Sequence, residues 1–205
     1  MNLIKKVQVT KVLLMAGFLA VPLLSFAEQQ TFKIDNNHSF VNWQIRHVSA
    51  KTSGTFSDVT GSLLIDRKAL ANSSVEAKIN LLSVNSSMAK RDEHIKKEDY
   101  LDAFKFGIAT FKSTKIDAKS ESEGVITGEF TLHGITKTIS FPFKVLGFDT
   151  DPWGGYRVGL EATTAIKASD YGFNWGAKPK ASVGDEVVLN LLIEGVQTPP
   201  AAKAY

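Results

Sequence analysis

Cysteine is absent from the 205 residues of this chain. The absence excludes disulfides, thiolate metal sites, a cysteine nucleophile and an acyl-cysteine lipid anchor. Histidine is also scarce: the chain has four, and no two of them stand at the short spacing of a local metal-binding pair. We therefore predict no metal site and no cofactor, and we expect His38 and His133 to lie at strand ends, bonded to the turn backbone.

Signatures of catalysis are missing as well. The sequence has no Gly-x-Ser-x-Gly nucleophile elbow and no glycine-rich loop at the start of a helix. Its paired acids, Glu98-Asp99 and Asp185-Glu186, stand among other charged residues, as solvated surface acids do. We predict no catalytic residue and expect that the protein is not an enzyme.

Without its N-terminal segment, the chain has no net charge. The chain carries 24 basic and 21 acidic side chains, but three lysines, Lys5, Lys6 and Lys11, stand at or before the start of an apolar run at residues 12–24. Removing these three leaves 21 basic side chains against 21 acidic ones. Because no basic patch remains, the sequence predicts no nucleic-acid partner.

The N-terminal segment has the pattern of a secretory signal peptide. Its apolar run is shorter than the roughly 18 residues that a membrane span needs. Small residues follow it in Ser25-Phe26-Ala27, at both positions that a signal peptidase reads. We predict a cleaved signal peptide over residues 1–27, a mature chain that begins at Glu28 in the periplasm, and no stable membrane anchor.

Period-two alternation dominates the mature sequence. In residues 39–47, Val41, Trp43 and Ile45 alternate with polar residues, which gives the segment one apolar face and one polar face. Such segments predict about eight antiparallel strands in a single domain over residues 28–197, followed by a flexible tail over 198–205. The other seven segments cover residues 61–66, 74–81, 108–116, 125–133, 136–148, 156–167 and 186–196. Pro142 cannot donate to a ladder, so we expect it at an edge or a bulge.

One segment, residues 88–111, differs from the rest. Asp92 with Lys96 and Glu93 with Lys97 stand four apart with the acid first, an arrangement that supports a helix. We expect one inserted helix near residues 86–104. Because its apolar residues are few, we expect this helix to lie as a lid on the domain rather than inside its core.

Two all-β architectures fit this order of elements: a sandwich and a closed up-and-down barrel. The long strands favour an all-β, antiparallel, eight-stranded barrel, because barrel strands are tilted. An interior of this size is either filled by side chains or wide enough for one slender ligand. The sequence thus leaves two functions open: a carrier of a long-chain lipid, and a stress or interaction protein without a ligand.

Six short motifs, in order along the mature chain, resemble those of the YceI-like family. They are Asp35-Asn36-Asn37-His38-Ser39, Arg91-Asp92-Glu93-His94, Phe111-Lys112-Ser113-Thr114, Thr131-Leu132-His133-Gly134-Ile135-Thr136-Lys137, Ser169-Asp170-Tyr171-Gly172-Phe173 and Val183-Gly184-Asp185-Glu186-Val187. The resemblance implies a lipocalin-like barrel in the periplasm that carries a polyisoprenoid or similar long-chain amphiphile in an apolar channel, rather than an enzyme.

The resemblance also implies which residues contact the ligand. The channel lining would comprise the inward-facing residues Val41, Trp43, Ile45, Phe111, Phe130, Phe141 and Phe143. The mouth, near the ligand head group, would carry Arg91, Asp92 and His94. The alternative for Arg91 and Asp92 is that they brace the lid against the barrel rim.

Two positions depart from the family pattern. Phe106-Gly107 stands where the family has an aromatic-proline pair, and Ala168 stands where it has an arginine, which puts the family head-group preference in doubt. Trp153 and Trp175 are flanked by glycine and are expected to cover an edge of the core. A homodimer through an edge strand or through the loop around Trp153 is left open.

Overall fold

The computed structural model describes residues 29–176 and 178–198. The predicted signal peptide and most of the predicted C-terminal tail lie outside these residues. Thr198, the first residue of that tail, donates its backbone N–H to the Thr31 carbonyl at 2.9 Å. In the described part of the chain, every helix is too short or too polar to cross a bilayer.

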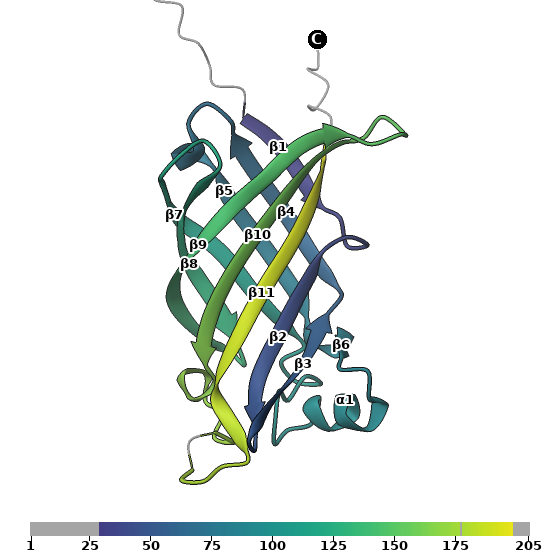
Figure 1. Cartoon of the computed structure of the whole chain (residues 1–205), viewed down its shortest axis with the longest axis vertical. Coiled ribbons are helices and arrows are strands. Elements are labelled where there is room, and N and C mark those ends of the chain that lie inside the picture. The colour runs from purple at the N-terminus through teal and green to yellow at the C-terminus, as the bar shows by residue number, and fades with distance from the viewer. Residues whose placement is uncertain (1–28, 177, 199–205) are drawn as a thin grey trace, which may run out of the picture.

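Eleven strands form one antiparallel sheet (Figure 1). They are β1 (Gln29–Ile34), β2 (Phe40–His47), β3 (Ala50–Phe56), β4 (Val59–Asp66), β5 (Ser74–Asn80), β6 (Val84–Asn85), β7 (Ile108–Ala118), β8 (Glu123–Leu132), β9 (Ile135–Thr150), β10 (Tyr156–Lys167) and β11 (Val183–Gln197). One α-helix, α1 (Ala89–Ile95), and three short 3₁₀ turns, Leu70–Asn72, Leu81–Ser83 and Ala168–Tyr171, complete the secondary structure of the described residues.

The sheet closes on itself through β11. The N-terminal part of β11 pairs with β2 and its C-terminal part pairs with β1, so β1 and β2 lie end to end along the same neighbour. In the same way β4 and β3 follow one another beside them, and β5 and β6 follow next. The eleven strands therefore occupy the eight positions of a closed barrel, which confirms the predicted architecture.

Three of the strands are not predicted by alternation. The most instructive is β3, whose sequence Ala-Lys-Thr-Ser-Gly-Thr-Phe is almost entirely polar or small. It pairs with β2 residue by residue from Ala50 opposite His47 to Phe56 opposite Val41. The β2–β3 turn imposes this pairing, so the strand forms without an apolar face of its own.

The helix is shorter than expected. It ends at Ile95 instead of reaching residue 104, and turns occupy the chain from there to residue 106. The expected pair of Asp92 with Lys96 is replaced by other partners: Asp92 accepts from the backbone N–H of Ser86 at 2.8 Å, and Lys96 pairs with Glu93 at 3.0 Å. Asp102 has a left-handed φ of 46°, which a helix continuing to residue 104 does not allow. None of the residues of α1 is buried, as expected for a lid.

The barrel has two distinct ends, which we call upper and lower as drawn in Figure 1. The upper end carries the β9–β10 turn and the point where the described chain begins and ends. The lower end carries α1, the β2–β3 turn, the β8–β9 turn and the β10–β11 loop.

The wall is incomplete between β9 and β10 near the lower end. Their pairing runs from Thr150 opposite Tyr156 to Phe143 opposite Ala162. Pro142, the neighbour of Phe143, lies just beyond the last residue pair between β9 and β10. Its missing N–H therefore falls where β9 has no partner in β10, at an edge as predicted. The β10–β11 loop fills the space: His133 bonds the Tyr171 carbonyl at 3.1 Å, and the buried Tyr171 ring meets Phe130 edge to face at 5.5 Å.

Candidate ligand-binding channel

Two cavities lie in line inside the barrel. The upper one has a volume of about 120 Å³ and the lower one about 410 Å³. Four side chains border both cavities: Val41, Ile79, Phe130 and Leu189. The two cavities are therefore adjacent parts of the barrel interior, with these four side chains between them, and we refer to them together as the channel. We call its two parts the upper chamber and the lower chamber.

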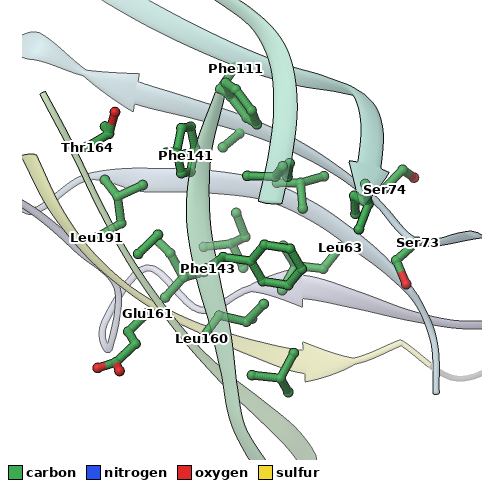
Figure 2. A pocket seen from close by; sticks show the side chains of 18 of the residues that line it. Leu63, Ser73, Ser74, Phe111, Phe141, Phe143, Leu160, Glu161, Thr164 and Leu191 are labelled. Atoms are coloured by element: carbon green, nitrogen blue, oxygen red, sulfur yellow. The ribbon is translucent and has the colours of Figure 1, made fainter. Parts of the chain in front are cut away.

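The upper chamber is lined by hydrocarbon (Figure 2). Phe111, Phe141 and Phe143 reach into it from β7 and β9, and the rings of Phe111 and Phe141 lie 5.4 Å apart. Leu63 and Leu191 lie around them, while Glu161 directs its carboxylate away from the group (Figure 2). Such a surface gains free energy by covering a hydrocarbon chain and offers little to a polar group.

The lower chamber has a mixed lining. Trp43 from β2 and Trp175 from the β10–β11 loop stand on its wall together with Tyr100 and Phe173. Its nitrogen-bearing groups are those of Arg91, His47, His94 and the two indoles. Among the described residues, no aspartate or glutamate borders it. The lower chamber is thus rich in hydrogen-bond donors and poor in negative charge.

Trp43 occupies its place because β3 has a glycine opposite it. A Cβ on Gly54 would lie 2.4 Å from Cζ2 of the Trp43 ring and 2.6 Å from the Asn85 carbonyl oxygen. Any larger residue would therefore displace the indole or the neighbouring backbone. The small residues of β3, which give it no alternating pattern, make room for Trp43, one of the two tryptophans of the lower chamber.

A row of six rings closes the lower end. In order they belong to His94, Tyr100, Trp175, Phe173, His133 and Phe106, with successive centroids 4.7, 5.4, 4.4, 4.7 and 4.4 Å apart. The row joins three segments that are distant in sequence: α1 with its following turns, the β8–β9 turn and the β10–β11 loop. Stacked and edge-to-face pairs at these distances are favourable, so the row holds the three segments together across the channel end.

All seven residues predicted to line the channel border it. Phe111, Phe141 and Phe143 belong to the upper chamber, Trp43 and Ile45 to the lower, and Val41 and Phe130 to both. Alternation in the strands and the family resemblance together led to their assignment. Trp175, Tyr100 and Phe173 were missed as lining residues because they lie in turns and loops, where no periodicity tells which way a side chain points.

The three residues predicted at the mouth do not all border the channel. Arg91 and His94 border the lower chamber, but Asp92 does not, which corrects the expectation for this residue. Asp92 instead accepts from the Ser86 backbone and hydroxyl, while Arg91 donates through Nε to the Ser86 hydroxyl at 2.7 Å and through Nη2 to the Ser86 carbonyl at 2.6 Å. Both residues therefore brace the segment that leads into α1.

The remaining aromatic and histidine predictions are settled by geometry. Trp175 covers the lower chamber, whereas Trp153 is 87% exposed at the β9–β10 turn, so the expectation that it covers a core edge is wrong. His133 forms a hydrogen bond with the Tyr171 backbone carbonyl, in line with the expectation that it bonds backbone at the end of a strand. His38 bonds the Asp35 side chain at 2.9 Å rather than the turn backbone.

A charged cluster stands on the outer wall near the upper end. Arg157 of β10 lies 2.7 Å from Asp35, 2.6 Å from Asp151 and 2.5 Å from Glu194. The hydrogen bond from His38, with Arg157 contributing, lowers the pKa of Asp35 to about 2 despite its burial. The bonds to Asp35 and Asp151 in turn raise the pKa of Arg157 above its usual value.

This cluster is a structural clamp. Asp35, His38 and Glu194 bring three possible metal ligands within 4.8 Å of one another. The Arg157 guanidinium donates to both carboxylates and already supplies the positive charge that a cation would bring. It joins the β1–β2 turn, the β9–β10 turn, β10 and β11, which fixes the wall of the upper chamber.

Comparison with known proteins agrees with this geometry. Residues 32–195 match the family model described as the YceI-like domain. A UPF0312 protein of Shewanella sp. (strain MR-7) is 36% identical over 185 residues, which cover 90% of this chain and 95% of that protein. A UPF0312 protein of Ectopseudomonas mendocina is 38% identical over 161 residues, 78% of this chain and 83% of the relative.

Solved structures share the fold. BcnA of Burkholderia cenocepacia superposes with a TM-score of 0.71 at 22% identity, covering 78% of this chain and 98% of BcnA. A polyisoprenoid binding domain from Saccharophagus degradans superposes with a TM-score of 0.63 at 17% identity, covering 82% of this chain and 99% of the domain. With a family model that spans nearly the whole described chain and relatives above one-third identity, this chain belongs to the YceI-like family.

Proposed function

We propose that this protein is a periplasmic carrier that holds a polyisoprenoid or similar long-chain amphiphilic lipid in its channel and has no enzymatic activity. The observation that carries the proposal is the pair of adjacent cavities of about 120 and 410 Å³ inside the barrel. Ligand pockets have volumes of roughly 300–1,000 Å³ in total, and their linings are mostly apolar. The name of the Saccharophagus degradans domain, which shares this fold, supports a ligand of the same class.

Energetics favour a long chain over a compact ligand. Each methylene that leaves water for an apolar wall contributes about 0.8 kcal/mol, so a chain lying through both chambers binds with few polar contacts. The alternative, an interaction protein with a side-chain-filled barrel, gives no reason for two cavities inside the barrel. The channel residues named above would line the ligand, with Arg91 and His94 near its polar end.

Native mass spectrometry of residues 28–205, purified from periplasm without detergent, tests the proposal. We expect a stoichiometric adduct whose solvent extract is a long-chain isoprenoid or fatty compound. A bare mass, together with no uptake when such lipids are added back, would overturn the carrier function.

A blocked channel supplies the matched comparison. Leu189→Trp places a large ring among the four side chains that lie between the two chambers, and we expect it to abolish retention of long-chain lipid. Leu192→Trp, on the exposed face of the same strand, should retain the adduct. Thermal unfolding should show that both variants are folded. Equal retention of lipid by the two would then contradict a ligand that passes through both chambers.

The periplasmic location follows from the N-terminal sequence. We infer that the chain is exported and cut before Glu28. N-terminal sequencing of the protein from a periplasmic fraction should begin at Glu28. A chain that keeps Met1 and sediments with membranes would contradict both the cleavage and the absence of an anchor.

A further inference from the structure

Two tryptophans that line the lower chamber carry unpaired hydrogen-bond donors. The chain has three tryptophans, and two of them, Trp43 and Trp175, border this chamber. In both, the indole Nε1 is buried and has no hydrogen-bond partner among the described residues. Trp43 is only 7% exposed, so its N–H has lost water without gaining a protein acceptor. Buried donors are rarely left in this state, because the loss of hydration is not offset.

The hydroxyls of Thr52, Tyr100 and Ser182 lie on the same wall, but none of them bonds either indole. The other polar side chains of the lower chamber include Arg91, His47 and His94, and none of its described lining residues is acidic. The upper chamber, by contrast, has an aliphatic and aromatic lining in which the one carboxylate points away (Figure 2). The two ends of the channel therefore prefer opposite ends of an amphiphile.

We propose that the lower chamber recognises a ligand head group that accepts hydrogen bonds without donating them, a carbonyl oxygen bonded by the Trp43 and Trp175 indoles, with the hydrocarbon tail directed into the upper chamber. This inference rests on the carrier function proposed above and adds the orientation and chemistry of the ligand. Both rings border the cavity, but neither Nε1 has accessible surface there, so an oxygen seated in the chamber reaches these N–H groups only when the rings shift.

A neutral head group fits better than an anionic one. Two indoles carry no charge, and a buried anion is stable only when a cation pairs with it. Arg91 is the permanently charged group of the chamber, but its Nε and Nη2 already donate to Ser86. A carbonyl oxygen requires only the two donors that lack partners.

Three probes of equal chain length separate the possibilities: methyl hexadecyl ketone, octadecane and octadecyl phosphate, each loaded from cyclodextrin into the mature full-length protein. We expect the ketone to bind at least about fivefold more tightly than the hydrocarbon. Trp43→Phe and Trp175→Phe should each weaken ketone binding by about fivefold and leave octadecane binding within about twofold, because the ring is kept and only the N–H is lost.

Trp153→Phe is the matched control, since Trp153 is exposed at the opposite end of the barrel. Nitrogen-15 labelling of the three indoles gives a direct readout. The Trp43 and Trp175 N–H resonances should move downfield when the ketone binds, and the Trp153 resonance should stay in place.

Equal affinity for ketone and octadecane, with unmoved indole resonances, would overturn this inference while leaving the carrier function intact. Preferential binding of the phosphate, lost in Arg91→Met and unchanged in the two Phe variants, would overturn it in favour of an anionic head group. Failure of all three probes to bind would count against the carrier function itself.

Discussion

The upper and lower chambers are walled in different ways. Long paired strands surround the upper chamber, and the Arg157 cluster clamps them from outside. Turns, loops and α1 close the lower chamber. The backbone differs accordingly: every non-glycine residue with a positive φ in the described chain lies in a turn at the lower end. These residues are Val48, Ser87, Asp102, His133 and Lys180.

The difference indicates a division of labour. Left-handed backbone at a residue other than glycine costs about 1 kcal/mol or more, and for a β-branched residue such as Val48 the cost is greatest. Such strain persists where geometry matters more than stability. The upper chamber thus has the regular, clamped wall, while the strained backbone lies at the lower end, beside the row of six rings.

The largest effect should come from a charge in the upper chamber. Val145→Asp puts a carboxylate into the aliphatic lining, and we expect it to cost about 3–5 kcal/mol of unfolding free energy and to abolish lipid retention. Its neighbour Leu146 is 60% exposed, so Leu146→Asp should change stability by less than about 0.5 kcal/mol. Urea denaturation measures the unfolding free energy of both variants. Similar losses of free energy would show that the upper chamber does not have an apolar lining.

A smaller loss should follow from opening the clamp. Arg157→Met leaves Asp35, Asp151 and Glu194 close together without their cation, and we expect a loss of about 2–3 kcal/mol at pH 7. Arg67→Met, at an exposed arginine that bonds Tyr156 and lies over the Phe148 ring, should cost less than about 1 kcal/mol. Equal melting temperatures for the two variants would mean that the clamp does not stabilise the upper wall.

Gly54→Ala acts on the lower chamber. The added Cβ meets both the Trp43 ring and the Asn85 carbonyl, and we expect an overpacking cost of about 1–3 kcal/mol with a shift of the Trp43 indole resonance. In β10, a Cβ on Gly159 finds its nearest atom, the Leu146 Cβ, at 3.6 Å, so Gly159→Ala should be nearly neutral. An unchanged Trp43 resonance in Gly54→Ala would place the indole elsewhere.

Acid should weaken the upper wall first. The pKa of Asp35 is lowered from its usual 3.8 to about 2, so its stabilising contribution of about 1–2 kcal/mol is complete above pH 4 and is lost as the pH falls towards 2. Hydrogen exchange follows this directly: the Asp35 amide, bonded to Glu194, should exchange faster in acid before the Val48 amide of the lower end does. Asp35→Asn should be less stable at pH 5 and lose less stability on acidification.

The sequence predicted the barrel and its lining because alternation is a local property. Val41, Trp43 and Ile45 show their common face within one strand, and the same holds for Phe141 and Phe143. The family resemblance added the lipocalin-like type of barrel, the expected ligand class and the residues expected to contact the ligand. Nothing beyond neighbouring residues was needed to tell inside from outside.

The features that alternation could not predict depend on contacts between distant segments. Arg157 meets Asp35 across the barrel wall, and Trp175 meets Tyr100 across the lower end. The family resemblance placed Asp92 at the mouth, but Ser86, which lies before the helix, donates to its carboxylate. Polar side chains choose partners by geometry, and a single sequence does not reveal the competing ones.

Closure of the barrel joins the beginning of the described chain to its end. Phe32 of β1 pairs with Gln197 of β11, and Asp35 donates its N–H to the Glu194 carbonyl. Contacts of such long range form slowly, because the entropy of the whole intervening loop must be lost before they are made. A chain emerging N-terminus first therefore cannot seal its interior until the final strand arrives, and until then the hydrophobic lining of both chambers stays open to water and to any lipid within reach.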